Sequence, residues 1–227
     1  MPHHTRPRFE KIRVVSDVPK LLDMSTCERI DHFNYFRGMQ NPYMGVTVNV
    51  DVTELVSTCR SMGCSFYIAF IHCAALAADR VPELRRRIHG DGIIEYERCP
   101  SSHIELLDNG LYCYCTLHHD MPVREYLKTA EALRKAARSK GGIEEESDVD
   151  SMYFMTSLPW LSYTALVQPT GNDSNPRISW GKYFEDSRGK LVLPVSILAH
   201  HALVDGLNLA QFYAALEREL SNFCEEA

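Results

Sequence analysis

Residues 200–206 read His-His-Ala-Leu-Val-Asp-Gly, and this stretch decides the fold that the sequence predicts. It follows the apolar run LVLPVSILA at 191–199 and precedes an amphipathic segment from about Leu207 to Phe223. Neighbouring residues of a strand point to opposite faces, so one histidine can face a cleft while the other is structural. Histidine is suited to take a proton from an alcohol because its ordinary pKa is about 6.5. The simpler alternative is a core histidine followed by an ordinary Asp-Gly turn.

Hydrophobic periodicity on both sides of this stretch predicts a single α/β domain, a two-layer sandwich in which helices cover a mixed sheet. Helices are expected at 25–37, 53–62, 66–79, 121–140 and 207–223. Strands are expected at 46–52, 93–97, 104–107, 111–117, 152–157, 163–167, 178–184 and 191–199.

The sequence predicts an N-terminal arm followed by one domain. Residues 1–24 mix Pro, Arg and His without periodicity and are expected to form an N-terminal arm, so that 25–227 form the catalytic domain. The acidic run at 144–150 is expected to be a solvated loop rather than a site.

The composition narrows the function classes. A chain of 227 residues with 45% hydrophobic and 24% charged residues is typical of a globular protein. Its formal net charge of -6 argues against nucleic acid as a partner. No apolar run reaches the length of a membrane span, and the first residues lack the apolar stretch of a signal peptide. We therefore expect a cytoplasmic protein with no membrane partner.

The metal-binding residue types give no convincing site. The eight cysteines are expected to be free thiols in a reducing compartment. Cys113 and Cys115 share a strand face but lack a second pair at zinc-site spacing, so we expect buried small side chains there. The histidines at 118–119, followed by Asp120, are expected to be solvated. No metal is predicted.

The whole stretch at 200–206 matches His-His-x-x-x-Asp-Gly, the signature of the CoA-dependent acyltransferase superfamily, and the chain most resembles the chloramphenicol acetyltransferases. Several ordered blocks make the resemblance more specific than a single motif. It extends over about 27–223, and its further blocks are Arg29-Ile30-Asp31-His32-Phe33, Ser65-Phe66-Tyr67, Ser157-Leu158-Pro159-Trp160 and Gly181-Lys182-Tyr183.

The resemblance implies a direct transfer of an acetyl group with His201 as the general base. Thr156 stands at the position of a serine that stabilises the oxyanion in the family, and it keeps the hydroxyl but adds a methyl group. Ser179 takes the place of a threonine that helps to hold a water near the intermediate. Arg29 and Asp205 correspond to an ion pair that supports the turn carrying the histidine, so Asp205 is a scaffold residue rather than a triad acid.

The resemblance also implies acetyl-CoA as co-substrate and a homotrimer with active sites between subunits. Tyr67, Lys182 and Tyr183 match positions that contact CoA, although each is as well explained as an ordinary half-buried or solvated residue. Tyr35 and Phe36 match an aromatic pair of the acceptor pocket. The acceptor is expected to be a hydroxyl of a small molecule, with chloramphenicol as one candidate.

Other functions remain open at this point. A serine hydrolase built on Ser157, His201 and Asp205 would lack the Gly-x-Ser-x-Gly elbow, and its acid would lie only four residues from its histidine. A dihydrolipoyl acyltransferase core shares the motif, but no lipoyl domain is visible in the sequence. The chain can also be a catalytically weak or inactive CoA-binding trimeric scaffold, or an acetyltransferase for another natural-product alcohol or amine.

Overall fold

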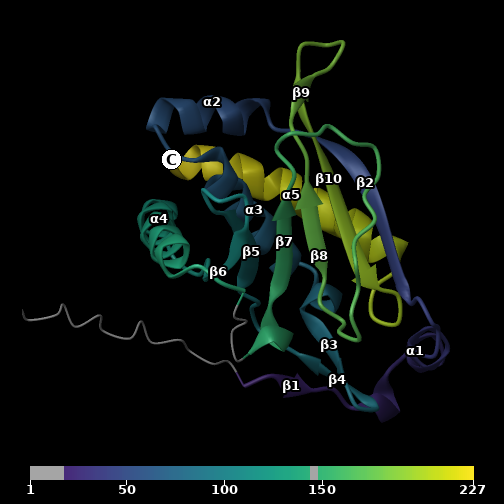
Figure 1. The fold of residues 1–227 in the computed structure, drawn as a ribbon. Helices are drawn as coiled ribbons and strands as arrows, with labels where there is room; N and C mark the ends of the chain where they lie inside the picture. Colours follow the sequence, from purple (N-terminus) through teal and green to yellow (C-terminus); the bar gives the residue numbers. More distant parts are fainter. Residues whose placement is uncertain (1–17, 144–147) are drawn as a thin grey trace, which may run out of the picture.

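The computed structural model describes residues 18–143 and 148–227 (Figure 1). Within these residues the main sheet has seven strands, in the order β2-β10-β8-β7-β5-β6 with β9 beside β10, and a second sheet has the order β1-β4-β3. The strands are β1 (Lys20–Leu21), β2 (Tyr43–Asp51), β3 (Arg86–His89), β4 (Gly92–Glu95), β5 (Ser101–Leu106), β6 (Tyr112–Leu117), β7 (Tyr153–Ser157), β8 (Arg177–Trp180), β9 (Phe184–Glu185) and β10 (Leu191–His200). The helices are α1 (Ile30–Arg37), α2 (Thr53–Met62), α3 (Phe66–Asp79), α4 (Val123–Lys140) and α5 (Gly206–Glu226), and the 3₁₀ turns are η1 (Met24–Thr26), η2 (Pro82–Arg85) and η3 (Val149–Ser151).

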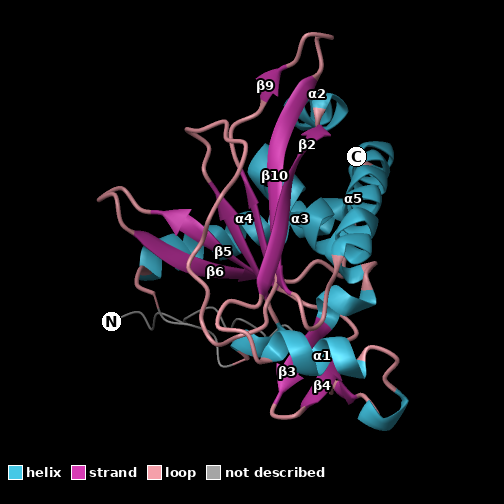
Figure 2. Ribbon diagram, turned by 90° about the vertical axis from the view of Figure 1, so that its right-hand side faces the viewer, coloured by secondary structure: helices cyan, strands magenta, loops and turns pink. Residues whose placement is uncertain are grey.

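Helices cover one face of the main sheet, and loops cross the other. In Figures 1 and 2, α3, α4 and α5 lie on the same side of the sheet, while α1 lies beside the small sheet. The helix α3 packs on α5, α4 packs on β5 and β6, and α2 packs on α3 and α5. The expected α/β sandwich with a mixed sheet is confirmed.

The two helices at 53–62 and 66–79 have the bounds that the sequence predicts. The first ends at Gly63, which adopts φ +67°, a left-handed conformation that glycine reaches without strain. The second, α3, is apolar nearly all round and is buried from Ile68 to Ala75, because it lies between the sheet and α5.

The pairing of β2 with β10 brings the start of β2 to the histidine pair. The strands are antiparallel, and His200 lies opposite Tyr43. Gly45 allows this close approach, because a Cβ at that position would lie 2.5 Å from the carbonyl oxygen of Ile197. The loop after α1 is thereby placed against the end of β10.

The strand expected at 163–167 is wrong. Strands β7 and β8 pair in parallel, so the chain between them must return along the sheet before it can start β8. Residues 158–176 make this return across the open face, without strand pairing, and we call them the crossover loop. The neighbouring positions in the sheet are already taken by β5 and β10, and Val167 is 95% exposed. The sequence analysis also missed β1 and β3.

The predicted N-terminal arm lies mostly outside the described residues, as does 144–147 of the acidic run. Of the arm, Lys20 and Leu21 pair with Glu95 and Ile94 and add an edge strand to the small sheet.

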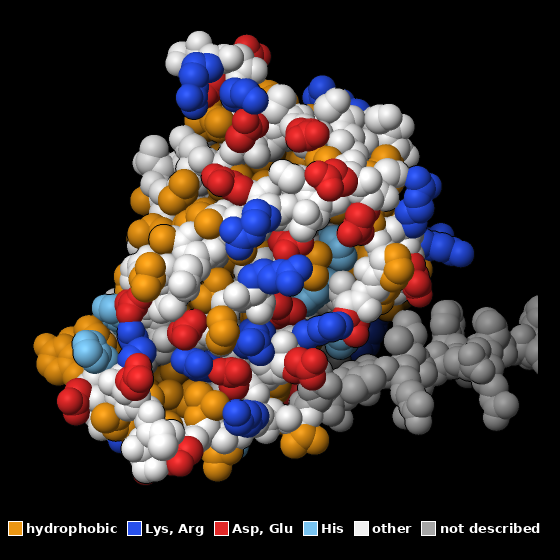
Figure 3. All heavy atoms as spheres, turned by 180° about the vertical axis from the view of Figure 1, so that it is seen from behind, with side chains coloured by type: hydrophobic (Ala, Val, Ile, Leu, Met, Phe, Trp, Pro, Cys, Tyr) orange, Lys and Arg blue, Asp and Glu red, His pale blue; other side chains and the backbone are white. Residues whose placement is uncertain are grey.

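The cysteines and the surface agree with the composition. All eight cysteines are free thiols. Figure 3 shows Lys and Arg side chains interspersed with Asp and Glu over the described part of the rear face, so that face presents no extended basic area. No helix among residues 18–143 and 148–227 is long and apolar enough to cross a membrane.

Candidate active site

The histidine pair lies where β10 ends and the chain turns into α5. The N–H of His201 donates to the carbonyl oxygen of Pro42 at 2.7 Å, which ties the turn to the start of β2. The Asp205 carboxylate accepts from Leu207 N–H at 3.1 Å, and the Asp205 N–H donates to the Asn208 side chain at 2.9 Å. This capping box determines where α5 begins, and therefore shapes the turn that carries His201.

The ring of His201 is held in one tautomer. Its Nδ1 lies 2.9 Å from the carbonyl oxygen of Val204. A carbonyl oxygen can only accept a hydrogen bond, so Nδ1 carries the proton and Nε2 of the neutral ring keeps a free lone pair. The residue is half-buried, so part of it stays open to a substrate. A general base requires this combination of a fixed ring and a free nitrogen.

The two expected acceptor-pocket residues lie on α1, next to this ring. Phe36 lies against the imidazole of His201, with ring centroids 3.8 Å apart and 32° between the planes. Tyr35 meets Phe36 edge-on at 5.1 Å and is 66% exposed. Phe36 is therefore in contact with the candidate base, and Tyr35 is one ring further out. Their role in acceptor binding stays a prediction.

His200 is the structural member of the pair. It is 6% exposed, its Nδ1 accepts from the N–H of Ala202 at 3.2 Å, and its ring meets Tyr43 edge-on. The pKa of His200 is lowered to about 4, mainly by burial; Asp173 acts in the opposite direction, and the neighbouring His201 adds a smaller lowering effect. His200 is therefore neutral near pH 7.

This lowered pKa predicts an acid-sensitive contribution to stability. Between about pH 6.5 and 4 the unfolded chain binds a proton at His200 and the folded chain does not, so the free energy of unfolding falls as the pH falls. One such group contributes a slope of up to about 1.4 kcal/mol per pH unit. Denaturant unfolding of the wild type and His200→Asn from pH 7.5 to 4 measures it, because asparagine keeps an acceptor and does not titrate. His72, whose pKa burial also lowers to about 4, is present in both proteins. If the free energy of unfolding depended on pH in the same way in both proteins, the prediction would be contradicted.

The predicted Arg29–Asp205 pair is present, and it joins the residue before α1 to the cap of α5. Partial burial alone would raise the pKa of Asp205, but Arg29 and the capping N–H groups hold that pKa below its ordinary value. The two side chains are 30% and 34% exposed, so solvent screens the pair and its own contribution is about 1 kcal/mol or less. Removal of one partner from a fully buried ion pair leaves a buried, unpaired charge and destabilises the fold strongly. The Arg29–Asp205 pair is partly exposed, so this larger loss of stability is not expected here.

Replacing Asp205 tests the cap and the pair together. Asp205→Ala loses both and is expected to lower the free energy of unfolding by about 1–2 kcal/mol, whereas Asp205→Asn keeps a capping oxygen and is expected to lose about half as much. Chemical denaturation of both variants measures the difference. Equal losses in the two variants would show that the cap contributes nothing.

Thr156 and Ser179 lie side by side on the open face of the sheet. The register pairs Thr156 of β7 with Ser179 of β8, and Ser179 with Ser196 of β10. Ser196 in turn lies opposite Thr47 of β2, with 2.7 Å between their hydroxyl oxygens. Residues in register point to the same face, so four hydroxyls form a row across four strands. We call these residues the hydroxyl row.

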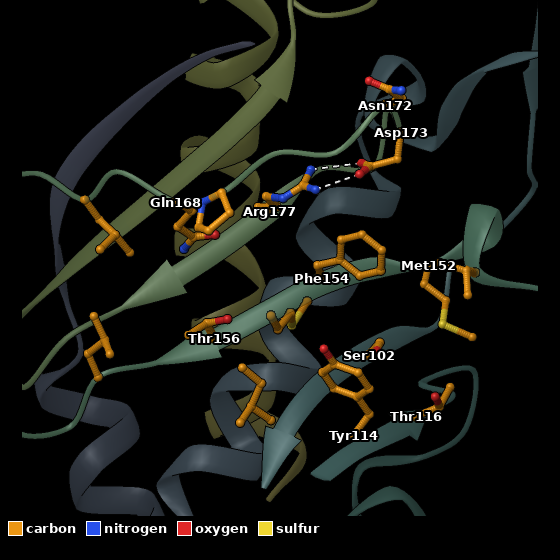
Figure 4. A pocket seen from close by; sticks show the side chains of 16 residues that line it. Ser102, Tyr114, Thr116, Met152, Phe154, Thr156, Gln168, Asn172, Asp173 and Arg177 are labelled. Carbon is orange, nitrogen blue, oxygen red and sulfur yellow. Dashed lines mark hydrogen bonds and ion pairs between the residues drawn. The ribbon is translucent and has the colours of Figure 1, made fainter. Parts of the chain in front are cut away.

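Two cavities open along this row, under the crossover loop. The larger one has a volume of about 670 Å³ and includes Thr156, Tyr114 and Phe154 among its lining (Figure 4). The smaller one, of about 160 Å³, includes Ser179 and Ser196. A cavity of several hundred Å³ with mixed apolar and hydroxyl lining fits a small organic molecule.

The structure does not bring His201 to Thr156 within one chain. Thr156 lies two strands from Ser196, and His201 lies five residues further along β10 and its exit. Strand geometry makes this roughly 10 Å across the sheet and about 16 Å along it. His201 and Thr156 of a single subunit are therefore too far apart to act on the same reacting carbonyl group.

The three candidate CoA residues lie near the carboxyl end of β8. Lys182 is exposed, and Tyr183 meets Phe66 of α3 edge-on with centroids 5.5 Å apart. Tyr67 is more enclosed, because its hydroxyl donates to the carbonyl oxygen of Ile104 at 2.9 Å. Tyr67 therefore has an internal hydrogen bond, and Lys182 is the candidate most open to a phosphate. Contact of these residues with CoA stays a prediction.

The sequence analysis missed the polar end of the larger cavity. Arg177 donates to both carboxylate oxygens of Asp173 at 2.9 and 2.7 Å, and its guanidinium lies 5.3 Å from the ring centroids of both Tyr43 and Phe154. It also missed Gln168, which lines both cavities and whose Nε2 donates to Ser179 Oγ. No motif marks these residues, because they meet only when the crossover loop folds back on the sheet.

The expected solvated histidines include one that is buried. His119 is 4% exposed, and its Nε2 lies 2.6 Å from Asp79 Oδ2 at the end of α3. The expectation for His119 is therefore wrong. Among the residues that the structure describes, no group of three or more His, Cys, Asp or Glu side chains could hold a metal ion.

Comparison with known proteins gives a consistent result. The family model described as chloramphenicol acetyltransferase matches residues 19–217. The chain is 24% identical over 211 residues to a chloramphenicol acetyltransferase of Proteus mirabilis, covering 91% of this chain and 94% of that protein. It is 25% identical over 203 residues to one of Bacillus pumilus, covering 87% and 91%.

Solved structures show the same fold. A chloramphenicol acetyltransferase structure superposes with a TM-score of 0.79 at 22% identity, covering 89% of this chain and 99% of the other. A probable dihydrolipoamide acetyltransferase from Listeria monocytogenes superposes with a TM-score of 0.66 at 16% identity, covering 85% and 89%. The family match extends over most of the chain and includes the histidine turn, the hydroxyl row and the crossover loop. The chain belongs to the chloramphenicol acetyltransferase family and is an acyltransferase.

Proposed function

We propose that this protein transfers the acetyl group of acetyl-CoA directly to a hydroxyl of a small molecule, with His201 as the general base. The observation that carries the proposal is the fixed tautomer of His201: the hydrogen bond from Nδ1 to Val204 O leaves Nε2 as the proton acceptor. A base whose ring is already oriented needs no rearrangement when the alcohol arrives.

The reaction is a single displacement at the thioester carbonyl. Nε2 of His201 takes the hydroxyl proton as the acceptor oxygen bonds to the carbonyl carbon. The resulting oxyanion accepts a hydrogen bond from Thr156, which is the role of a preplaced donor in acyl transfer. The intermediate collapses, the carbon–sulfur bond breaks, and the CoA thiolate receives the proton from His201. No acyl-enzyme forms.

The active site is shared between copies of the chain. His201 and Thr156 of one subunit are too far apart to act on one carbonyl, so His201 of one copy acts with Thr156 of another. The homotrimer that the resemblance implies supplies such neighbours in a closed ring. The open sheet face with its cavity is the surface on which the neighbouring subunit closes the site.

The two substrates approach this site from different sides. Lys182 meets a phosphate of CoA as a point charge, and Tyr183 borders the adenine. The acceptor occupies the larger cavity, whose hydroxyl and apolar groups fit a small natural-product alcohol. Chloramphenicol is the first acceptor to test, because it appears in the names of the relatives.

A thiol-release assay tests the proposal. Purified protein is mixed with acetyl-CoA and each member of a panel of alcohols and amines that includes chloramphenicol, and mass spectrometry identifies the acetylated product. We expect release of one CoA per acetyl group transferred. A resistance test in a sensitive host, with His201→Ala as the control, shows whether chloramphenicol is used in a cell.

The inactive-scaffold alternative predicts a different result. A scaffold would bind CoA, measured by calorimetry, and would release no thiol with any member of the panel. That outcome would contradict the proposed activity.

A further inference from the structure

Gln168 lies between the two cavities, and no sequence motif predicts this position. It lies on the crossover loop, is half-buried, and lines both the larger cavity with Thr156 and the smaller cavity with Ser179. Ser179 itself is 1% exposed and is not part of the larger cavity's lining. The polar group presented to the larger cavity beside Thr156 is therefore the amide of Gln168 and not the hydroxyl of Ser179.

The amide of Gln168 has a donor left over. Its Nε2 carries two protons, and one of them is donated to Ser179 Oγ. The other is free to meet a group in the larger cavity. Thr156 and Ser179 are partners in register on adjacent strands, so an amide held on Ser179 stands next to the Thr156 hydroxyl. Figure 4 shows the side chains of Gln168 and Thr156 projecting into the same cavity, one from the crossover loop and one from β7.

The loop holds Gln168 in a preset geometry. Pro169 follows it, and a residue before proline is restricted to extended conformations. Ser179 lies in the buried strand β8 and anchors the far end of the side chain. Ser196 and Thr47, the other members of the hydroxyl row, bond to each other. A donor fixed at both ends in this way is preorganised, which is what stabilisation of a developing negative charge requires.

We propose that Gln168 is a second catalytic hydrogen-bond donor to the oxyanion, beside Thr156, and that Ser179 is a positioning residue that acts through Gln168. The inference rests on the proposed acetyl transfer. When the acceptor oxygen bonds to the thioester carbon, the carbonyl oxygen becomes negatively charged and accepts from the Thr156 hydroxyl and from Gln168 Nε2. Neither donor loses its proton, and both hydrogen bonds weaken again when the carbonyl re-forms and the thiolate leaves.

This assignment gives a specific order of effects. Gln168→Leu keeps the size of the side chain and removes the amide, and it is expected to lower kcat by about 10²-fold with KM for both substrates within about threefold. Gln168→Glu removes the donors and adds a negative charge, so it is expected to lower kcat at least as much. Ser179→Ala is expected to lower kcat less than Gln168→Leu, and Ser179→Thr, which keeps the oxygen, is expected to restore it. The double variant Ser179→Ala/Gln168→Leu is expected to be no worse than Gln168→Leu alone, because both act through one group.

The experiment is steady-state kinetics on these variants with acetyl-CoA and an acceptor that the wild type uses. Gln211→Leu is the matched control, because Gln211 is an exposed residue of α5. Thermal unfolding and the oligomeric state of each variant are measured in parallel, and Gln168→Glu provides a second soluble test if Gln168→Leu unfolds.

The outcomes separate the inference from the proposed function. If the wild type transfers no acetyl group, the proposed function fails, and the inference fails with it. If the wild type is active, His201→Ala is inactive, and Gln168→Leu keeps kcat within about threefold or loses only in KM, then only the role of Gln168 is wrong. A loss in Ser179→Ala larger than in Gln168→Leu, or additive losses in the double variant, would also overturn it, since Ser179 would then act directly.

Discussion

His201→Ala is expected to lower kcat for acetyl transfer by about 10⁴-fold, the largest effect of any single substitution in this protein. Alanine removes the imidazole that we propose as the base, and it is expected to leave the capping box of α5 and the Arg29–Asp205 pair in place. Because the loss arises from a missing base and not from unfolding, the variant is expected to bind acetyl-CoA like the wild type.

A thiol-release assay measures the loss of kcat, and calorimetry measures whether the variant still binds CoA. His89→Ala is the matched control, because His89 is an exposed residue at the end of β3 in the small sheet. Activity of His201→Ala within tenfold of the wild type would mean that another group takes the proton, and the proposed mechanism would be abandoned.

Thr156→Val is expected to lower kcat by about 10²- to 10³-fold, the effect of removing one donor to an oxyanion. Valine has the shape of threonine without the hydroxyl, so packing against the neighbouring strands is kept. Substrate binding is expected to change little, because the hydrogen bond strengthens only when charge develops on the carbonyl oxygen.

Thr156→Ser provides the complementary measurement. It keeps the donor and removes the methyl group, so its kcat is expected to equal or exceed that of the wild type. Thr170→Val, on the exposed part of the crossover loop, is the control for a lost hydroxyl. Equal kcat values for Thr156→Val and the wild type would show that the oxyanion is stabilised elsewhere.

The sequence predicted the parts of the fold that depend on local patterns. The apolar run of α3, the glycine that ends α2 at position 63 and the apolar run of β10 all produce the expected elements. The contact between Arg29 and Asp205, which are 176 residues apart, was expected only because of the resemblance to a known family. No periodicity in the chain would have revealed it.

The parts that the sequence did not predict depend on contacts between distant strands. Residues 163–167 of the crossover loop were expected to form a strand, but the order of β7 and β8 in the sheet leaves them no partner. His119 is buried because Asp79, 40 residues away, accepts its hydrogen bond. Gln168 reaches the cavity because the crossover loop lies over β8, where the Gln168 amide contacts Ser179. The spacing of residues along the chain carries no information about these contacts between distant residues.

The capping box at the start of α5 also limits where CoA can be recognised. The positive end of a helix dipole attracts phosphate groups when its first N–H groups are free. At α5 the carboxylate of Asp205 already accepts from these N–H groups, so they are not free to bind a phosphate. In the proposed complex with acetyl-CoA, we therefore expect the start of α5 to hold the histidine turn in place and not to bind a phosphate of the cofactor.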